Sequence, residues 1–163
     1  MSVELERGAL DELAASWRAG WEGAGFKGCC TPDVAYEDPV AVQPLRRVED
    51  LDGHARTVRA AFPDLRVEAT APPLARGDHA CVPFRALGTH RGDVGTFLPA
   101  TDRFVTLHGL HYLELSEGKV RRARGFFDLY DAATQLGLLP ARGGMGETVL
   151  LMLRGFGLRR RGA

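Results

Sequence analysis

The sequence predicts an α+β fold, with helices packed on one face of a curved antiparallel sheet. Apolar residues recur at three- and four-residue intervals in residues 4–22 and 48–62, which is the helical period. The pattern then changes to alternation, which is typical of strands, and the last two strands are joined by a tight turn. A curved antiparallel sheet wrapped around a helix leaves a conical cavity, which is where such a domain would bind a ligand.

Two amphipathic helices open the chain. In residues 4–22 one stripe carries Leu5, Leu10, Leu13, Ala14, Trp17 and Trp21, and two glycines end the helix. In residues 48–62 one face carries Leu51, Ala55, Val58 and Phe62, and Pro63 ends the helix. The other side of this second helix, which includes His54, is expected to be solvated.

The strands come next. A first strand is stopped by Pro39, a second by the Pro72–Pro73 pair, and the last two are joined at Ser116–Glu117–Gly118. We expect strands at residues 34–38, 65–69, 79–89, 103–115 and 119–127.

A helix from Asp128 to Gly137 closes the predicted domain, which spans residues 1–140. Residues 141–163 form a C-terminal helical extension that is apolar between Thr148 and Leu153 and then basic. Its apolar residues are expected to pack over the mouth of the cavity or on a partner in a homodimer.

Composition excludes several classes of protein. The 21 Lys and Arg residues balance the 21 Asp and Glu residues, whereas nucleic-acid binding requires a surplus of positive charge. No run of residues is long and apolar enough to cross a bilayer, and the N-terminus does not resemble a secretory signal. The three cysteines, at 29, 30 and 81, do not form a disulfide framework. We therefore expect a cytoplasmic protein that binds neither nucleic acid nor membrane.

Six short motifs occur in an order that indicates a family. They are Y-E-D-P at 36–39, A-A-F-P-D-L at 60–65, G-T-H-R-G at 88–92, A-T-D-R at 100–103, E-G-K-V at 117–120 and F-F-D…Q-L-G at 126–137. Together they resemble the SnoaL-like polyketide cyclases of the nuclear transport factor 2-like superfamily. Ketosteroid isomerases and limonene epoxide hydrolases are relatives. The resemblance covers about residues 5–140 and implies a cone-shaped α+β barrel, usually dimeric, with an apolar cavity between sheet and helices.

The resemblance also implies a catalytic carboxylate on the last strand, and this sequence departs from it there. Relatives that perform acid/base chemistry carry R-D-x-x-D on that strand, and its first Asp is the general acid/base of the cyclases. Here the segment reads Arg124–Gly125–Phe126–Phe127–Asp128, so glycine replaces that Asp. The second Asp, Asp128, is expected to cap the following helix, a role that lowers the pKa of a carboxylate and makes it a poor base.

Three other residues are candidates for catalysis. If Gly125 faces the cavity, register in relatives places His111 inward, and a histidine can act as acid or base near neutral pH. Tyr36 and Asp38 lie two apart on one strand and so share a face, and relatives use these positions to contact water or substrate. We expect His111 as the base, Asp38 as its partner and Tyr36 as a donor to oxygen. The alternative is that these residues have only structural roles, in the core or in a turn.

The pocket is expected to be roomy and apolar. Small residues on the inner face of the sheet, Gly125 among them, suit a bulky or polycyclic ligand. The predicted substrate-binding residues are Trp17, Trp21, Phe84, Gly125 and Phe127. Neither a metal-ligand cluster nor a phosphate-binding loop is visible, so no cofactor and no metal are expected.

The sequence therefore predicts a cofactor-independent cyclase or isomerase that acts on an apolar polyketide-type intermediate of secondary metabolism. The expected chemistry removes a proton next to a carbonyl and closes a ring within the pocket. Two alternatives remain open: a non-catalytic small-molecule-binding domain, which would explain Gly125 directly, and an epoxide-opening hydrolase.

Overall fold

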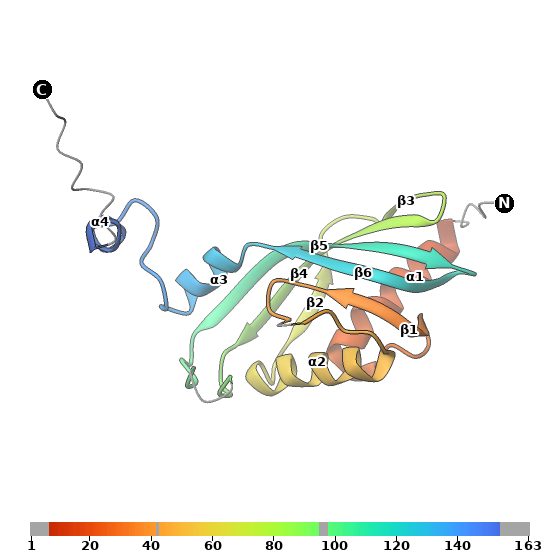
Figure 1. The fold of residues 1–163 in the computed structure, drawn as a ribbon, viewed down its shortest axis with the longest axis horizontal. Helices are drawn as coiled ribbons and strands as arrows, with labels where there is room; N and C mark the ends of the chain where they lie inside the picture. Colours follow the sequence, from red (N-terminus) through yellow and green to blue (C-terminus); the bar gives the residue numbers. More distant parts are fainter. Residues whose placement is uncertain (1–6, 42, 95–97, 154–163) are drawn as a thin grey trace, which may run out of the picture.

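The computed structural model describes residues 7–41, 43–94 and 98–153 of the chain. Helices α1 (Arg7–Ala19) and α2 (Val48–Ala61) lie on the same side of a six-stranded sheet (Figure 1). The strands are β1 (Cys30–Glu37), β2 (Arg66–Ala69), β3 (Leu74–Arg76), β4 (His79–Thr89), β5 (Phe104–Ser116) and β6 (Lys119–Phe127). Helices α3 (Leu129–Gln135) and α4 (Met145–Leu153) follow the last strand.

The predicted α+β fold, with the N-terminal helices on one face of the sheet, is confirmed. The sheet itself is mixed and open rather than wholly antiparallel and closed. The strand order is β1-β6-β5-β4-β2, with β3 paired to β4. All pairs are antiparallel except β1 and β6, which run parallel with Tyr36 opposite Ala123. Tight turns force neighbouring strands to alternate in direction, but β1 is followed by α2 rather than by a turn. Its direction was therefore not determined by the local sequence pattern.

Most predicted elements lie where alternation and turn residues placed them. Strands β4 and β6 have the predicted bounds, and β5 and α2 differ by one residue at their ends. Strand β3 was missed, since the Pro72–Pro73 pair was interpreted only as a stop and the strand follows directly after it. The start of the first helix at residue 4 and the basic end of the extension, 159–161, lie outside the described residues.

A π-helical turn, Gly20–Ala24, continues α1 and brings a second tryptophan into the core. Gly23 has φ 117°, a conformation that favours glycine, and it helps to end the helix there. Trp17 and Trp21 are both buried, and their rings lie 6.3 Å apart in an edge-to-face arrangement. Together with Phe26 and Tyr36 they fill the space between α1 and the sheet.

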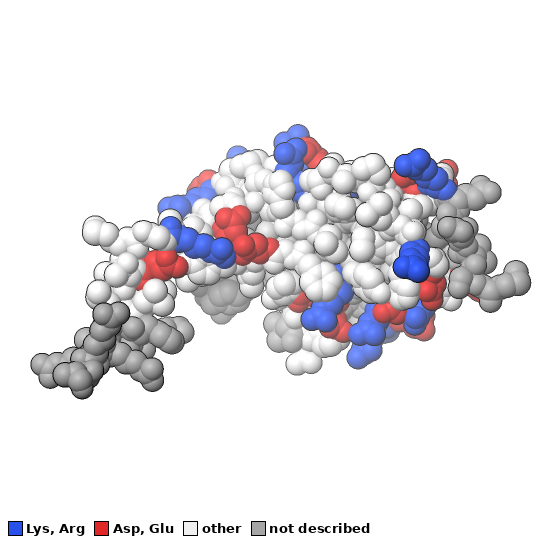
Figure 2. Space-filling view, turned by 90° about the horizontal axis from the view of Figure 1, so that it is seen from above, with Lys and Arg blue, Asp and Glu red and all other residues white. Residues whose placement is uncertain are grey.

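The far side of the sheet carries no helix among the described residues. Figure 2, which views the molecule from above, shows a largely uncharged middle with separate groups of charge around it. Leu110 and Phe126 are exposed, as alternation predicts for this face. This exposed face is a candidate for the interface of the expected homodimer.

Helix α4 buries none of its residues. Met145 and Leu153 are more than four-fifths exposed at 87% and 81%, and the helix is joined to the body through Tyr130, whose hydroxyl contacts Glu147. None of the described residues of the extension covers the cavity described below. None of the helices in the described parts of the chain is long and apolar enough to span a bilayer.

Ending the chain at Pro140 is therefore expected to leave the unfolding temperature within about 2 °C of the full-length value, because exposed residues contribute little to folding. Thermal melting measures this, and sizing in solution tests the expected dimer. A fall of more than about 5 °C would show that the extension packs on its own domain. A smaller particle with unchanged melting would place the extension between two copies.

Candidate active site

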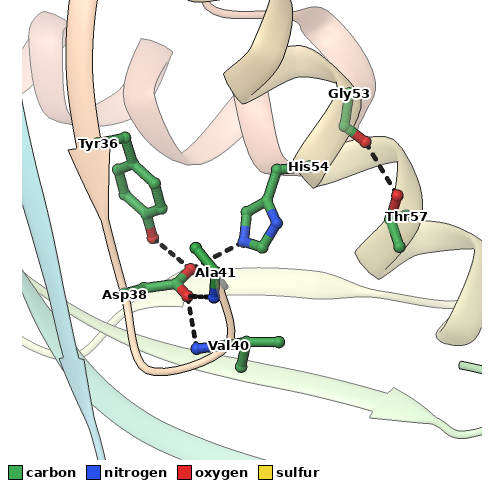
Figure 3. A network of polar contacts seen from close by, with 7 residues as sticks. All are labelled: Tyr36, Asp38, Val40, Ala41, Gly53, His54 and Thr57. Carbon is green, nitrogen blue, oxygen red and sulfur yellow. Dashed lines mark hydrogen bonds and ion pairs between the residues drawn. The ribbon is translucent and has the colours of Figure 1, made fainter. Parts of the chain in front are cut away.

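Asp38 is the centre of a hydrogen-bonded network at the end of β1 (Figure 3). Its Oδ2 accepts from the Tyr36 hydroxyl at 2.9 Å and lies 2.8 Å from His54 Nε2. Its Oδ1 accepts from the backbone amides of Val40 and Ala41 at 2.7 and 2.6 Å. These four contacts hold the Asp38 carboxylate in place, and the Asp38 side chain is only 4% exposed.

Local sequence explains this arrangement. Tyr36 and Asp38 are two residues apart on a strand and so point to the same face. Pro39 ends β1, and the turn that follows presents its free amides to the Asp38 carboxylate, as Asp commonly arranges in turns. The chain then returns along β1, where Leu45 pairs with Tyr36.

His54 was expected to be solvated, and the structure shows that expectation to be wrong. Its side chain is 13% exposed and points from α2 toward Asp38. His54 follows the buried Leu51 by three positions, so it lies on the face of α2 that packs on β1. That spacing was the signal in the sequence that could have revealed it.

The network favours an ionised Asp38. Burial alone would raise the pKa of this carboxyl, but the hydrogen bond and charge of His54, the Ala41 amide and the Tyr36 hydroxyl lower it below its usual value. Burial, and then the charge of Asp38, raise the pKa of Tyr36 well above its usual value. Tyr36 therefore stays protonated and donates its hydrogen bond to the carboxylate.

Gly125 faces this network from β6. A Cβ atom at this position would lie 3.0 Å from the Tyr36 hydroxyl, 3.2 Å from Asp38 Cβ and 3.5 Å from His111 Cδ2. The first two distances are tighter than nine in ten real Cβ contacts, so a Cβ here would require Tyr36 or Asp38 to move by a few tenths of an ångström. Tyr36 and Asp38 therefore occupy the space that a side chain on β6 would take.

His111 lies beside Gly125 but in an aromatic stack. Its ring is stacked on Phe84 at 4.5 Å and on Trp21 at 5.6 Å, and Trp17 contacts it edge-on at 5.3 Å. Burial lowers the pKa of His111 to about 3, and the charge of Asp38 opposes this only in part. The imidazole is therefore neutral near pH 7. Asp38 binds His54 and Tyr36, and no hydrogen bond joins it to His111 among the described residues.

A cavity of about 250 Å³ opens beside Asp38 and Gly125. It is lined by Glu37, Asp38, Pro39, Ala41, Pro44, Arg124, Gly125 and Phe126. Of the five residues predicted to bind substrate, only Gly125 is among this lining. Trp17, Trp21 and Phe84 surround His111 in the core, while Phe127 is half-buried opposite Gly109.

Other sequence expectations can be placed as well. Asp128 caps α3, where its Oδ1 accepts from the Asp131 amide at 2.9 Å. Buried His90 holds the loop between β4 and β5 through Thr101. Within residues 7–41, 43–94 and 98–153 no group of three His, Cys, Asp or Glu side chains could hold a metal ion.

Comparison with known families gives the assignment. A family model described as SnoaL-like polyketide cyclase matches residues 9–136. The chain belongs to the SnoaL-like polyketide cyclase family. This confirms the resemblance inferred from the six sequence motifs.

Solved structures with the SnoaL-like fold are similar at low sequence identity. TsrD from Streptomyces laurentii is 22% identical, with a TM-score of 0.73 over 83% of this chain and 100% of TsrD. IdmH from Streptomyces antibioticus, described as a candidate polyketide cyclase, is 20% identical, with a TM-score of 0.65 over 77% and 96%. An epoxide hydrolase of Mycobacterium tuberculosis, described as LEH-like, is 15% identical, with a TM-score of 0.58 over 90% and 97%. No curated protein matches the sequence. These similarities show the shared fold.

Proposed function

We propose that this SnoaL-like protein is a cofactor-independent cyclase or isomerase for an apolar, polyketide-type intermediate of secondary metabolism, with Asp38 supplying its acid/base carboxylate. The observation that carries the proposal is the Tyr36–Asp38–His54 network beside Gly125. The sequence resemblance implies a carboxylate on β6, and here a carboxylate from β1 occupies the adjoining space.

The proposed reaction needs no external reagent. Asp38 accepts a proton from a carbon next to a carbonyl, and the electron pair of that C–H bond moves to form an enolate. The enolate carbon attacks a second carbonyl carbon of the same molecule, which closes the ring and leaves an alkoxide. Protonated Asp38 returns its proton to that oxygen, or to carbon when the outcome is an isomerisation.

His54 and Tyr36 position the carboxylate in this scheme. Their hydrogen bonds favour its ionised form, which makes Asp38 a weak base that suits an already acidic carbon. His111, which the sequence suggested as the base, is instead stacked on Phe84 and Trp21 in the core and is not among the residues that line the cavity.

The experiment measures hydrogen–deuterium exchange at C1 of 2-tetralone, a bicyclic ketone, in D₂O by proton NMR. The wild-type protein is expected to accelerate exchange, and Asp38→Asn to reduce that acceleration by about 100-fold or more. Asp33→Asn, which changes an exposed aspartate of the same strand, is the matched control and keeps the wild-type rate. Melting curves confirm that each variant is folded.

A binding domain without catalysis is the second candidate. It is favoured by the four hydrogen bonds that already occupy the Asp38 carboxylate and by the low exposure of that side chain. Exchange no faster than in buffer, together with measurable binding of 2-tetralone, would support this candidate. Exchange that Asp38→Asn leaves unchanged would remove Asp38 from the mechanism.

A further inference from the structure

We propose that Arg124 binds an anionic oxygen of the ligand, a carboxylate or an enolate, in the cavity beside Asp38. The inference rests on the proposed function in placing the substrate at this cavity. It adds the chemical class of the group that the cavity recognises and the residue that recognises it.

Arg124 lies at the edge of the cavity, between an acidic residue on the neighbouring strand, Glu37, and the apolar ring of Phe126. It directly precedes Gly125 on β6 and stands opposite Glu37 of β1 in the parallel register. Its guanidinium carbon lies 5.4 Å from the ring centroid of Phe126, which is 47% exposed. Together with Pro39, Ala41 and Pro44, the Phe126 ring gives the cavity apolar surface for a flat ligand.

Arg124 is the charged residue of the cavity lining that has no oppositely charged partner among the described residues. Glu37 is paired with Arg122 at 3.6 Å, and Asp38 is bound by His54, Tyr36 and two amides. Both carboxylates of the lining are therefore already compensated. Among the described residues no carboxylate forms an ion pair with Arg124, although on the same strand Arg121 pairs with Glu114, and Arg122 pairs with Glu37 and Glu114.

An anionic oxygen fits this excess charge. A guanidinium presents parallel N–H donors that match two oxygens of a carboxylate or of an enolised 1,3-dicarbonyl. The proposed reaction also creates an enolate next to Asp38, where the cation of Arg124 would offset the new negative charge. An ordinary exposed cation–π pair with Phe126 is the competing explanation, and it predicts no preference for anions.

The experiment measures binding of 2-naphthoate and its uncharged methyl ester to the full-length protein by titration calorimetry. Wild-type protein is expected to bind the anion more tightly than the ester. Arg124→Gln should weaken naphthoate binding by about tenfold or more and leave the ester unchanged. Arg124→Lys should give an intermediate affinity for naphthoate, because it keeps the charge but loses the paired donors. Arg121→Gln, on the same strand but outside the lining, is the control that changes neither affinity.

A second probe separates the two sources of anionic oxygen. The enolate of 1,3-indanedione replaces naphthoate in the same titration, and loss of binding in Arg124→Gln for only one probe identifies that group as the ligand chemistry. The proposal is overturned if neither anion binds, if Arg124→Gln binds both anions as wild type does, or if it loses anion and ester equally. The two proposals are tested by different measurements: Asp38→Asn by the rate of exchange, and Arg124→Gln by the affinity for anions. Loss of this inference about Arg124 therefore leaves the proposed function of Asp38 intact, and loss of the proposed function leaves the binding result of Arg124 intact.

Discussion

Gly125→Asp is expected to lower the free energy of unfolding by about 4 kcal/mol, because it forces a second carboxylate into a filled space beside Asp38. The new Cβ would lie 3.0 Å from the Tyr36 hydroxyl and 3.2 Å from Asp38 Cβ. A second carboxylate beside Asp38 would be repelled by it, so the pKa of at least one of the two carboxyls should rise. Chemical denaturation measures the loss.

Three variants separate the causes of this effect. Gly125→Ala adds the crowding without the charge and is expected to cost about 1–3 kcal/mol. Gly28→Asp, at an exposed glycine with nothing within 4 Å of its Cβ position, should be nearly neutral. Adding Asp38→Asn to Gly125→Asp should recover part of the stability, because it removes the repulsion. Wild-type stability in Gly125→Asp would mean that the space beside Asp38 is not filled as described.

His111→Phe is expected to flatten the pH dependence of stability on the acid side of neutrality. The pKa of His111 is about 3 in the folded protein, against an ordinary value of 6.5. Between these values the unfolded chain binds a proton that the folded protein does not, so stability falls as the pH falls. The slope is about 1.4 kcal/mol per pH unit, which amounts to about 3 kcal/mol by about pH 4.

The window for this measurement is chosen to isolate His111. The stabilisation from the lowered pKa of Asp38 is present above its ordinary value of 3.8 and is lost only as the pH falls below that value. Urea denaturation of wild type and His111→Phe from pH 6.5 to about pH 4.5 therefore reports mainly on the imidazole. His108→Phe, an exposed histidine on the same strand, should keep the wild-type slope. Equal slopes in wild type and His111→Phe would show that the pKa of His111 is not lowered in the folded protein.

Local sequence patterns predicted the strands and the helices that build the site. The register implied by the family resemblance placed Gly125 and His111 on the face of the sheet that meets Tyr36, and the structure has them there. The hydrogen-bond partners were harder to predict, since they join elements far apart in the chain. Asp38 and His54 lie 16 residues apart, and only the packing of α2 on β1 brings them together.

Two further features could not be predicted from periodicity. The parallel pairing of β1 with β6 brings Glu37 beside Arg124, and alternation within a single strand contains no information about its neighbour. Alternation along β6 puts Arg124 and Phe126 on the opposite face from Gly125, and both are exposed. They still line the cavity, because it opens at the edge where β1 ends and the following turn begins.

The crowding between position 125 and Asp38 has an evolutionary consequence. A side chain at 125 would have to displace Tyr36 or Asp38, so we expect substitutions at 125 and at 38 to be epistatic in this chain. An Asp at 125 should be better tolerated once Asp38 has been replaced, because the second carboxylate is then gone. We therefore expect selection on this chain to retain glycine at 125 for as long as Tyr36 and Asp38 keep their hydrogen bond.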